Sequence, residues 1–238
     1  MKKSTLFMSF ILIGALVISS CKKKGCTDVT ASNYNSEAKK DDGSCIYYVT
    51  DIDGNNYPYK LICNKIWTTE NLYTKKYKNG DPIPQVQDAS TWENLTTGAW
   101  CYYNNDPSKG VLYNWHAVAD PRGLAPEGWH VPLDYDYTTL LDCQGGSSNA
   151  KKLKYITGWT NNNGTNESGF SALPRGFRAN LGFYDEFGVN GWWWTSSLNP
   201  SSNSTGAKVF YITDVSDIPA IGSCGNKMFG FSVRILRD

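Results

Sequence analysis

The chain of 238 residues lacks the motifs that identify common catalytic and metal sites. It contains two histidines, His116 and His130, and neither has a second histidine at ligand spacing. No H-E-x-x-H motif and no C-x-x-C pair occur, which argues against zinc ribbons and thioredoxin-like redox sites. No base stands beside the serine-rich tracts at 195–197 and 199–205 to activate a hydroxyl. We therefore predict no catalytic residue and no metal site, and interpret both histidines as structural.

The chain also lacks an excess of basic residues. Its 23 Lys and Arg face 22 Asp and Glu, for a formal charge of +1. Without residues 1–20, which hold Lys2 and Lys3 and no acid, 21 basic residues would face 22 acidic ones, for a charge of −1. Binding to a phosphate backbone needs a basic surplus, so nucleic acid is not an expected partner. The composition, 40% apolar and 19% charged, is that of a globular protein.

A long hydrophobic run is missing as well. Lys2 and Lys3 precede an apolar run from Leu6 to Ile18, which is shorter than the ~20 residues of a membrane-spanning helix. Ser19-Ser20-Cys21 follows, so residues 1–20 read as a signal peptide. The cysteine after small residues resembles the lipobox of bacterial lipoproteins, which implies that Cys21 is acylated. We expect an outer-membrane lipoprotein of the cell envelope, on either the periplasmic or the surface face of the membrane. The alternative is an ordinary secretory signal.

Six further cysteines remain, an even number that suggests up to three disulfides in an exported chain. Cys26 and Cys45 bracket a polar loop too poor in apolar residues to fold by core burial, and a bridge between them would close it. The pairing of the other four is left open: Cys63, Cys101, Cys143 and Cys224. The bracketed segment resembles a short cysteine-bounded module of surface and secreted proteins in Bacteroidetes-type bacteria.

The same loop contains oxygen-bearing side chains that could hold Ca²⁺, although Asp-Asp-Gly is first of all a turn sequence. These residues are Asp28, Asn33, Asn35, Asp41 and Asp42. Calcium is thus a minor possibility here, and no other cofactor is expected.

From Thr50 onward the pattern is that of a folded domain. Asp53-Gly54 between two short runs predicts a hairpin, and residues 61–67 predict a strand. Leu133, Tyr137, Leu140 and Leu141 share the i, i+4, i+7, i+8 spacing of one helix face, and Gly145-Gly146 should end that helix. Helices and strands do not alternate, so the predicted class is α+β with a mainly antiparallel sheet.

Aromatic residues are abundant, with nine Trp and 15 Tyr in the chain. Trp192, Trp193 and Trp194 are consecutive, and side chains alternate faces along a strand, so the set must be divided between two faces. We propose Trp192 and Trp194 as ligand-contacting rings, because Trp is frequent at binding surfaces; the alternative is that they fill the core. Four arginines beside apolar strand residues are interpreted as paired or stacked structural residues: Arg175, Arg178, Arg234 and Arg237.

Several motifs occur together in one order: W-x-x-E-N-L (67–72), L-Y-N-W (112–115), G-W-x-V-P (128–132), N-E-S-G-F-S-A-L-P-x-G-F-R (166–178), W-W-T-S-S (193–197) and G-F-S-V-R (230–234). Together they resemble the Fibrobacter succinogenes major paralogous domain, a family of exported, often lipid-anchored bacterial proteins. The resemblance implies a C-type-lectin-like or formylglycine-generating-enzyme-like fold, with a small twisted sheet, one or two helices and long loops. The calcium-and-sugar tripeptides of true C-type lectins are missing.

These observations divide the chain into a signal peptide (1–20), an anchor and cysteine-bracketed spacer (21–47), and the family domain (48–238). The expected function is non-enzymatic: binding or adhesion at the cell envelope, with a glycan or protein ligand and a membrane contact through the anchor. One alternative is a divergent formylglycine-generating-type oxidase, which needs a reduced thiol of low pKa. The other is a purely structural envelope protein.

Overall fold

The structure is a computed structural model that describes residues 22–146, 148–199 and 206–238. The chain forms two compact units, divided between Cys45 and Ile46. Within the described residues, no helix has both the length and the apolar character that crossing a membrane requires.

The small unit has almost no apolar interior, since Cys26 and Ala31 are its only buried hydrophobic residues among those described. A disulfide joins Cys26 to Cys45, with Cα atoms 4.7 Å apart, and confirms the predicted pairing. Closing a loop of this size stabilises it by roughly 3 kcal/mol on the chain-entropy model. Side-chain oxygens also accept hydrogen bonds from backbone N–H groups two residues on, in the pairs Asp28–Thr30, Asn35–Glu37, Asp41–Gly43 and Asp42–Ser44. These side chains therefore form turns, as the turn interpretation predicted.

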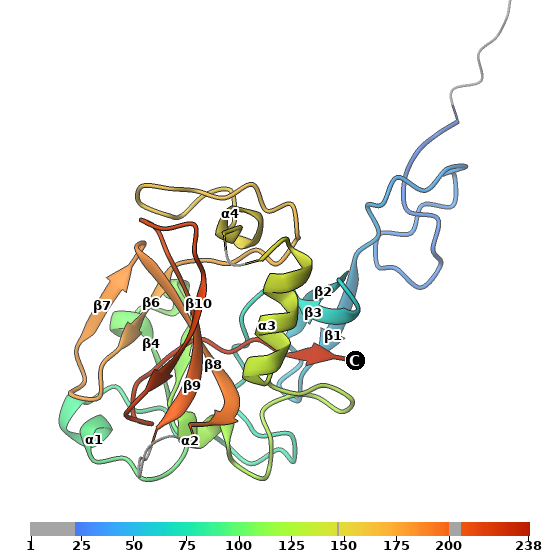
Figure 1. The fold of residues 1–238 in the computed structure, drawn as a ribbon. Helices are drawn as coiled ribbons and strands as arrows, with labels where there is room; N and C mark the ends of the chain where they lie inside the picture. The colour runs from blue at the N-terminus through green and yellow to red at the C-terminus, as the bar shows by residue number, and fades with distance from the viewer. Residues whose placement is uncertain (1–21, 147, 200–205) are drawn as a thin grey trace, which may run out of the picture. The chain divides into compact units, whose positions relative to one another are not determined.

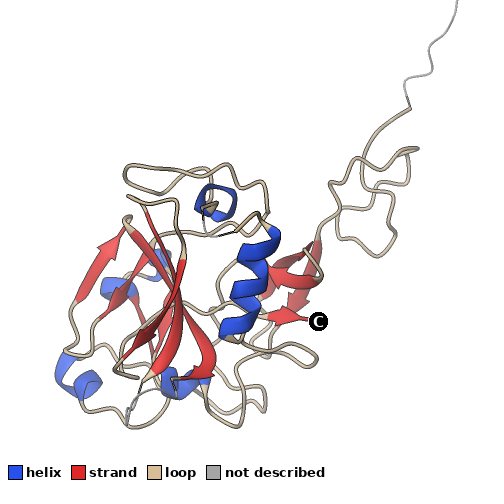
Figure 2. Ribbon diagram, in the orientation of Figure 1, coloured by secondary structure: helices blue, strands red, loops and turns tan. Residues whose placement is uncertain are grey.

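The large unit, residues 46–238, contains short strands and few helices (Figures 1 and 2). Its strands are β1 (Tyr47–Thr50), β2 (Asn56–Ile62), β3 (Lys65–Thr68), β4 (Trp100–Tyr102), β5 (Val111–Tyr113), β6 (Arg175–Arg178), β7 (Tyr184–Phe187), β8 (Asn190–Leu198), β9 (Ala207–Thr213), β10 (Ala220–Cys224) and β11 (Leu236–Arg237). Its helices are α1 (Ala89–Glu93), α2 (Trp115–Val118), α3 (Asp134–Cys143) and α4 (Ala150–Leu153), with 3₁₀ turns η1 (Tyr103–Asn105) and η2 (Pro107–Lys109).

The strands form three sheets, with orders β1-β2-β3-β11, β10-β9-β8-β6-β7 and β4-β5. All neighbouring pairs are antiparallel except β6 and β8, which are parallel. The predicted α+β class with a mainly antiparallel sheet is thus confirmed. Because β11 pairs with β3, the C-terminus lies beside the first hairpins of the domain (Figure 1).

The first hairpin forms where Asp53-Gly54 predicted it, between β1 and β2. Asp51 fixes its turn, because its carboxylate accepts hydrogen bonds from the N–H groups of Asp53 and Asn55, both at 2.9 Å. The predicted single strand over residues 61–67 is wrong, since the chain turns back between β2 and β3. Cys63 supplies that turn with a positive φ of 60°, a conformation that a sequence pattern does not reveal.

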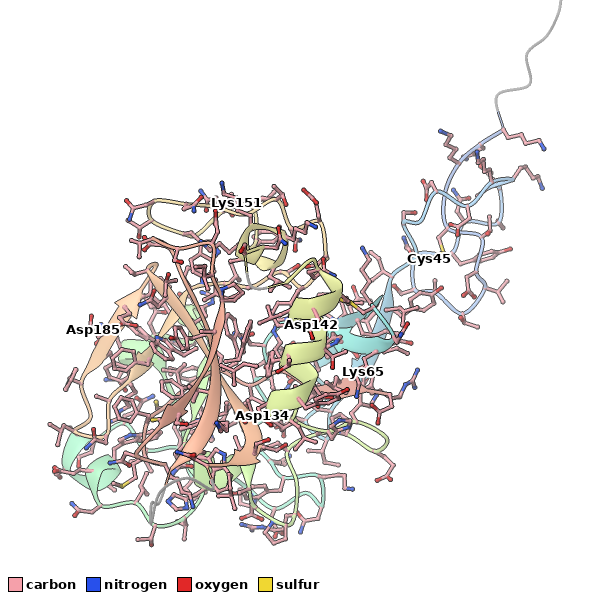
Figure 3. All side chains as sticks on the ribbon, viewed as in Figure 1. Cys45, Lys65, Asp134, Asp142, Lys151 and Asp185 are labelled. Atoms are coloured by element: carbon pink, nitrogen blue, oxygen red, sulfur yellow. A yellow bond between two sulfur atoms is a disulfide. The ribbon has the colours of Figure 1, made fainter. Side chains whose placement is uncertain are left out.

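The predicted helix after Pro132 is α3, which ends at Cys143 just before Gly145. Tyr137, Leu140 and Leu141 are buried as its spacing predicted, whereas Leu133 is 48% exposed and precedes the helix. Figure 3 labels Asp134 and Asp142 on α3, whose buried apolar side chains belong to the same core cluster as Trp193 of β8 and Phe210 of β9. Tyr137 stacks on Phe210 of β9 with ring centroids 4.3 Å apart, so this helix packs on the five-stranded sheet.

The three consecutive tryptophans of β8 are divided between two faces of the sheet, as strand alternation predicted. Trp193 packs against Phe170 and Phe210 in the same core cluster as α3. Trp192 and Trp194 contact Phe231 on the opposite face, with ring centroids 5.5 and 4.5 Å from it. Each face of β8 therefore has its own aromatic core.

Candidate functional site

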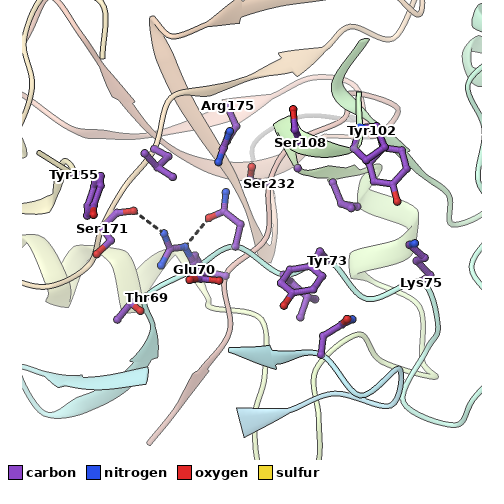
Figure 4. A pocket seen from close by; sticks show the side chains of 18 of the residues that line it. Thr69, Glu70, Tyr73, Lys75, Tyr102, Ser108, Tyr155, Ser171, Arg175 and Ser232 are labelled. Carbon is purple, nitrogen blue, oxygen red and sulfur yellow. Dashed lines mark hydrogen bonds between the residues drawn. The ribbon is translucent and has the colours of Figure 1, made fainter. Parts of the chain in front are cut away.

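A cavity of about 800 Å³ opens in the large unit, and we call it the cleft (Figure 4). Six separate stretches of chain line it: the β1–β2 turn, residues 69–75 after β3, the β4–β5 connection, Tyr155, residues 171–175 before β6, and residues 232–234 before β11. A cavity with a few convergent polar groups is the default candidate for a binding site. The lining is rich in hydroxyl, amide and charged side chains.

At the base of the cleft, Arg234 is 1% exposed and is surrounded by oxygen acceptors. Its guanidinium donates hydrogen bonds to the side chain of Asn71 and to three backbone carbonyls, those of Thr68, Phe170 and Ser171, at 2.6–3.1 Å. Burial lowers the pKa of Arg234 to about 10, so the group stays charged at neutral pH. We call Arg234, Asn71 and these acceptors the Arg234 hub.

Asn71 connects the hub to the core, because its Oδ1 accepts from both Arg234 Nε at 2.6 Å and Trp193 Nε1 at 2.9 Å. Ser171 has a positive φ of 56° and is held by Asn166, whose Oδ1 accepts from the Ser171 N–H at 2.9 Å. This backbone conformation presents the Ser171 carbonyl to Arg234. Four of the motifs that carry the family resemblance, those beginning at residues 67, 166, 193 and 230, therefore meet at this point.

Above the hub, two other polar groups lack protein partners. Arg175 is half-buried, and within the described residues its guanidinium makes no hydrogen bond and no ion pair. Its Cζ lies 5.9 Å from the centroid of the Phe187 ring. Burial lowers the pKa of Arg175 from its ordinary value. Ser232 is 1% exposed, and its buried hydroxyl has no hydrogen-bond partner in the described part of the chain. Both residues line the cleft, and Figure 4 labels them next to each other in its view; we call them the open pair.

Three tyrosines, Tyr73, Tyr102 and Tyr155, contribute aromatic surface to the cleft, and all are partly exposed. Tyr102 packs edge-on against Trp100 with ring centroids 5.0 Å apart, and Tyr73 packs on Tyr57 at 4.7 Å. Their neighbours thus fix the orientation of these rings before any ligand binds.

The cleft also holds two carboxylates. The charge of the Asp53 carboxylate is already balanced, since it accepts a hydrogen bond from the Lys75 N–H at 2.6 Å and forms an ion pair with Lys76 at 3.1 Å. Desolvation raises the pKa of Asp53, but its hydrogen bonds to Lys75, Lys76 and Thr74 outweigh that effect and lower it overall. Glu70 is exposed at the cleft. The side chain of Lys75 lies over the rings of Trp100 and Tyr102, at 5.5 and 5.7 Å.

The two rings predicted to contact a ligand, Trp192 and Trp194, do not line the cleft. Trp194 is 0% exposed and donates a hydrogen bond from Nε1 to the Tyr113 carbonyl at 2.8 Å. It offers no surface to a ligand, so the core alternative describes this ring. Trp192 is half-buried and donates to Glu186 Oε2 at 2.7 Å; a ligand contact for this ring stays a prediction.

The remaining cysteine predictions have different outcomes. Cys21 lies outside the described residues, so its acylation stays a prediction. Cys63 and Cys143 form a second disulfide, which ties the β2–β3 turn to the end of α3. Cys101 and Cys224 are free, so the third disulfide allowed by the count does not form. Burial raises the pKa of Cys101 to about 11 and also raises that of Cys224, which is opposite to the shift that a thiol nucleophile needs.

Neither histidine lies in the cleft. The backbone of His130 pairs with that of Leu236, and burial and Lys227 lower the pKa of His116. Within residues 22–146, 148–199 and 206–238, no group of three or more His, Cys, Asp or Glu side chains is arranged to hold a metal ion.

The sequence pattern predicts a structural role for all four arginines that stand beside apolar strand residues. That interpretation is correct for Arg234 in the hub and for Arg178, which lies 4.3 Å from the Trp92 ring centroid and donates to the Val86 carbonyl at 2.6 Å. It is correct for Arg237, which stacks over Trp129 at 5.5 Å. Arg175 differs, because its guanidinium has no acceptor within the described parts of the chain. Pro174 before it and Gly176 after it gave no signal of that difference.

Comparison with family models shows that the Fibrobacter succinogenes major domain matches residues 61–237 of the chain. The matched range contains almost the whole cleft, including the hub and the open pair. Comparison with curated proteins and with solved structures found no match.

Proposed function

We propose that this chain, which belongs to the Fibrobacter succinogenes major domain family, is a lipid-anchored binding protein of the cell envelope whose cleft holds a glycan. The observation that carries the proposal is the cleft itself: a preformed cavity of about 800 Å³ that combines partly exposed tyrosine rings with unpaired polar side chains. Sugars present apolar ring faces and many hydroxyls, and such a lining complements both.

The make-up of the cleft favours a sugar over a protein ligand. Protein interfaces depend on anchors that bury large apolar side chains in apolar pockets. Here Leu72 and Val111 are buried and belong to the core, so few aliphatic side chains remain accessible in the cleft. Asn55, Asn71 and Ser108 instead supply amide and hydroxyl groups at its surface.

A panel of neutral and acidic oligosaccharides, applied to the full-length protein purified in detergent, tests this function. Tyr102→Ala should weaken binding of the best ligand about tenfold, because a stacked ring contributes on the order of 1 kcal/mol beyond its buried area. Tyr48→Ala is the matched control, since Tyr48 is 46% exposed and lies outside the cleft. Equal binding by the two variants, or no binding of any oligosaccharide, would contradict a glycan site in the cleft.

The membrane part of the proposal has its own test. Cys21→Ser should leave the precursor without lipid and move the protein from the detergent phase to the aqueous phase on phase separation. A protein that stays in the detergent phase would show that Cys21 does not carry the anchor. This result is independent of ligand binding.

A further inference from the structure

We infer that the cleft recognises a carboxylate on its glycan, so that the ligand class is an oligosaccharide containing uronic acid, and that Arg175 is the residue that binds the carboxylate. This inference rests on the proposed function and specifies its ligand. It is carried by the open pair and by the amide of Asn71, which present hydrogen-bond donors to one part of the cleft.

Three side chains at the cleft carry hydrogen-bond donors that have no partner among the described residues. Asn71 Oδ1 is occupied by Arg234 and Trp193, which leaves its Nδ2 at the cleft without a partner among the described residues. The Ser232 hydroxyl is buried and unpaired, and the Arg175 guanidinium makes no hydrogen bond in the described part of the chain. A carboxylate accepts only, and a guanidinium fits it with two parallel N–H bonds. A neutral sugar hydroxyl would use one of these donors at a time.

The charge of Arg175 also favours an anionic ligand. A half-buried guanidinium without an acidic partner is costly to the folded protein, because desolvation disfavours the charged form. Arg234 below it is also charged and bonded only to neutral oxygens. Of the two carboxylates at the cleft, Asp53 is paired with Lys76, and the charge of the exposed Glu70 acts on Arg234, whose pKa it raises against the larger effect of burial. Arg175 forms no ion pair among the described residues, so an anion bound to its guanidinium offsets the cost of burying that charge.

The tyrosine rings favour an acidic sugar over an acidic peptide. Tyr155, which is 37% exposed, lies at one end of the cleft in Figure 4, Tyr102 and Lys75 lie at the other, and Arg175 lies between them. A chain of sugar rings can place faces on tyrosines and one carboxylate at Arg175. The second cation, Lys75, then meets a carboxylate further along the same chain.

The test compares two probes with the same sugar chain, one with charged and one with neutral carboxyl groups: tetragalacturonic acid and its fully methyl-esterified form. Calorimetry with the full-length protein in detergent should give tighter binding of the acid. Arg175→Met should weaken binding of the acid about tenfold to a hundredfold, as expected for loss of a hydrogen-bonded charge, and should change binding of the ester less than about twofold. Arg175→Lys keeps the charge and loses the paired N–H donors. Its affinity for the acid should therefore lie between that of the unmodified protein and that of Arg175→Met.

Arg237→Met is the control, because Arg237 is exposed and lies outside the cleft; it should leave both affinities unchanged. Equal affinity for acid and ester, or equal losses for both in Arg175→Met, overturns the inference and leaves a neutral glycan site standing. Binding of a polyglutamate peptide in place of the sugar contradicts the sugar class. Failure of every oligosaccharide to bind removes the proposed function itself, which the Tyr102→Ala comparison identifies separately.

Discussion

The Arg234 hub and the open pair contain the same kind of side chain in the same cleft, yet they differ in what surrounds it. Arg234 donates four hydrogen bonds, and all four end on protein oxygens. Arg175 has no such acceptor within the described residues, and Ser232 has an unpaired buried hydroxyl. A polar group that the protein saturates contributes to folding, and one that it leaves unsaturated costs stability unless a ligand supplies the partner.

The family motifs meet at the hub, where hydrogen bonds join distant segments of the chain. Asn71, Ser171 and Arg234 come from segments far apart in the sequence, and their bonds join the loop after β3, the loop before β6 and the segment before β11. That junction holds the base of the cleft rigid. A rigid base keeps the open pair in place before a ligand arrives, which lowers the entropic cost of binding.

Replacing Arg234 should have the largest effect. Arg234→Met leaves the carbonyls of Thr68, Phe170 and Ser171 buried with fewer donors, and we expect a loss of about 3–5 kcal/mol in the free energy of unfolding. Urea denaturation followed by tryptophan fluorescence measures it. The matched variant Arg237→Met should cost no more than about 1 kcal/mol, because it removes only the exposed contact of Arg237 with the Trp129 ring. Equal stability of the two variants would mean that the hub does not hold the domain together.

Loss of the disulfide between Cys63 and Cys143 should have the second largest effect. Neither cysteine lines the cleft, so this bond should contribute to stability and not to ligand binding. Cys143→Ser should lower the free energy of unfolding by about 2–4 kcal/mol, since the bond closes a long loop. The affinity for oligosaccharide should stay within about twofold. A large loss of affinity in a variant that is still folded would show that cleft geometry depends on this bond.

The smallest effect concerns pH. Burial and Lys227 lower the pKa of His116 in the folded state, so the unfolded chain binds more protons than the folded one just below the ordinary value of about 6.5. Stability should therefore be constant above that pH and fall as the pH decreases toward the folded-state pKa. Because less than one proton is involved, the slope is small.

His116→Gln should remove this slope, which denaturation at a series of pH values between 5 and 8 measures. Ligand affinity should stay flat over the same range, because Arg175 and a uronate carboxylate both keep their charge there. A slope that persists in the variant would assign the pH dependence to another group.

Much of the fold follows from local patterns in the sequence. Alternation divided Trp193 from its two neighbours, periodicity found the buried face of α3, and Asp53-Gly54 located the first hairpin. The Cys26–Cys45 bridge followed from a polar loop with no core of its own. These features depend on residues that are close in the sequence.

The cleft could not be predicted in this way, because its six segments come together only in the folded chain. No residue next to Arg175 in the sequence distinguishes it from Arg178, yet Arg178 has carbonyl acceptors and Arg175 has none among the residues that the structure describes. The turn at Cys63 was missed because a positive φ on a residue other than glycine has no sequence signature. The ligand-contact prediction for Trp194 overlooked the layer formed by Phe231.

A thermal unfolding experiment with tetragalacturonic acid tests most directly whether unsaturated groups in the cleft serve a ligand. A ligand that binds only the folded state raises the melting temperature by an amount that grows with the ratio of its concentration to its Kd. We expect a concentration-dependent rise for the unmodified protein, and for Arg175→Met a smaller rise at every concentration, which needs about tenfold to a hundredfold more ligand to reach the same value. The same rise in both proteins, or no rise in the unmodified one, would contradict the account.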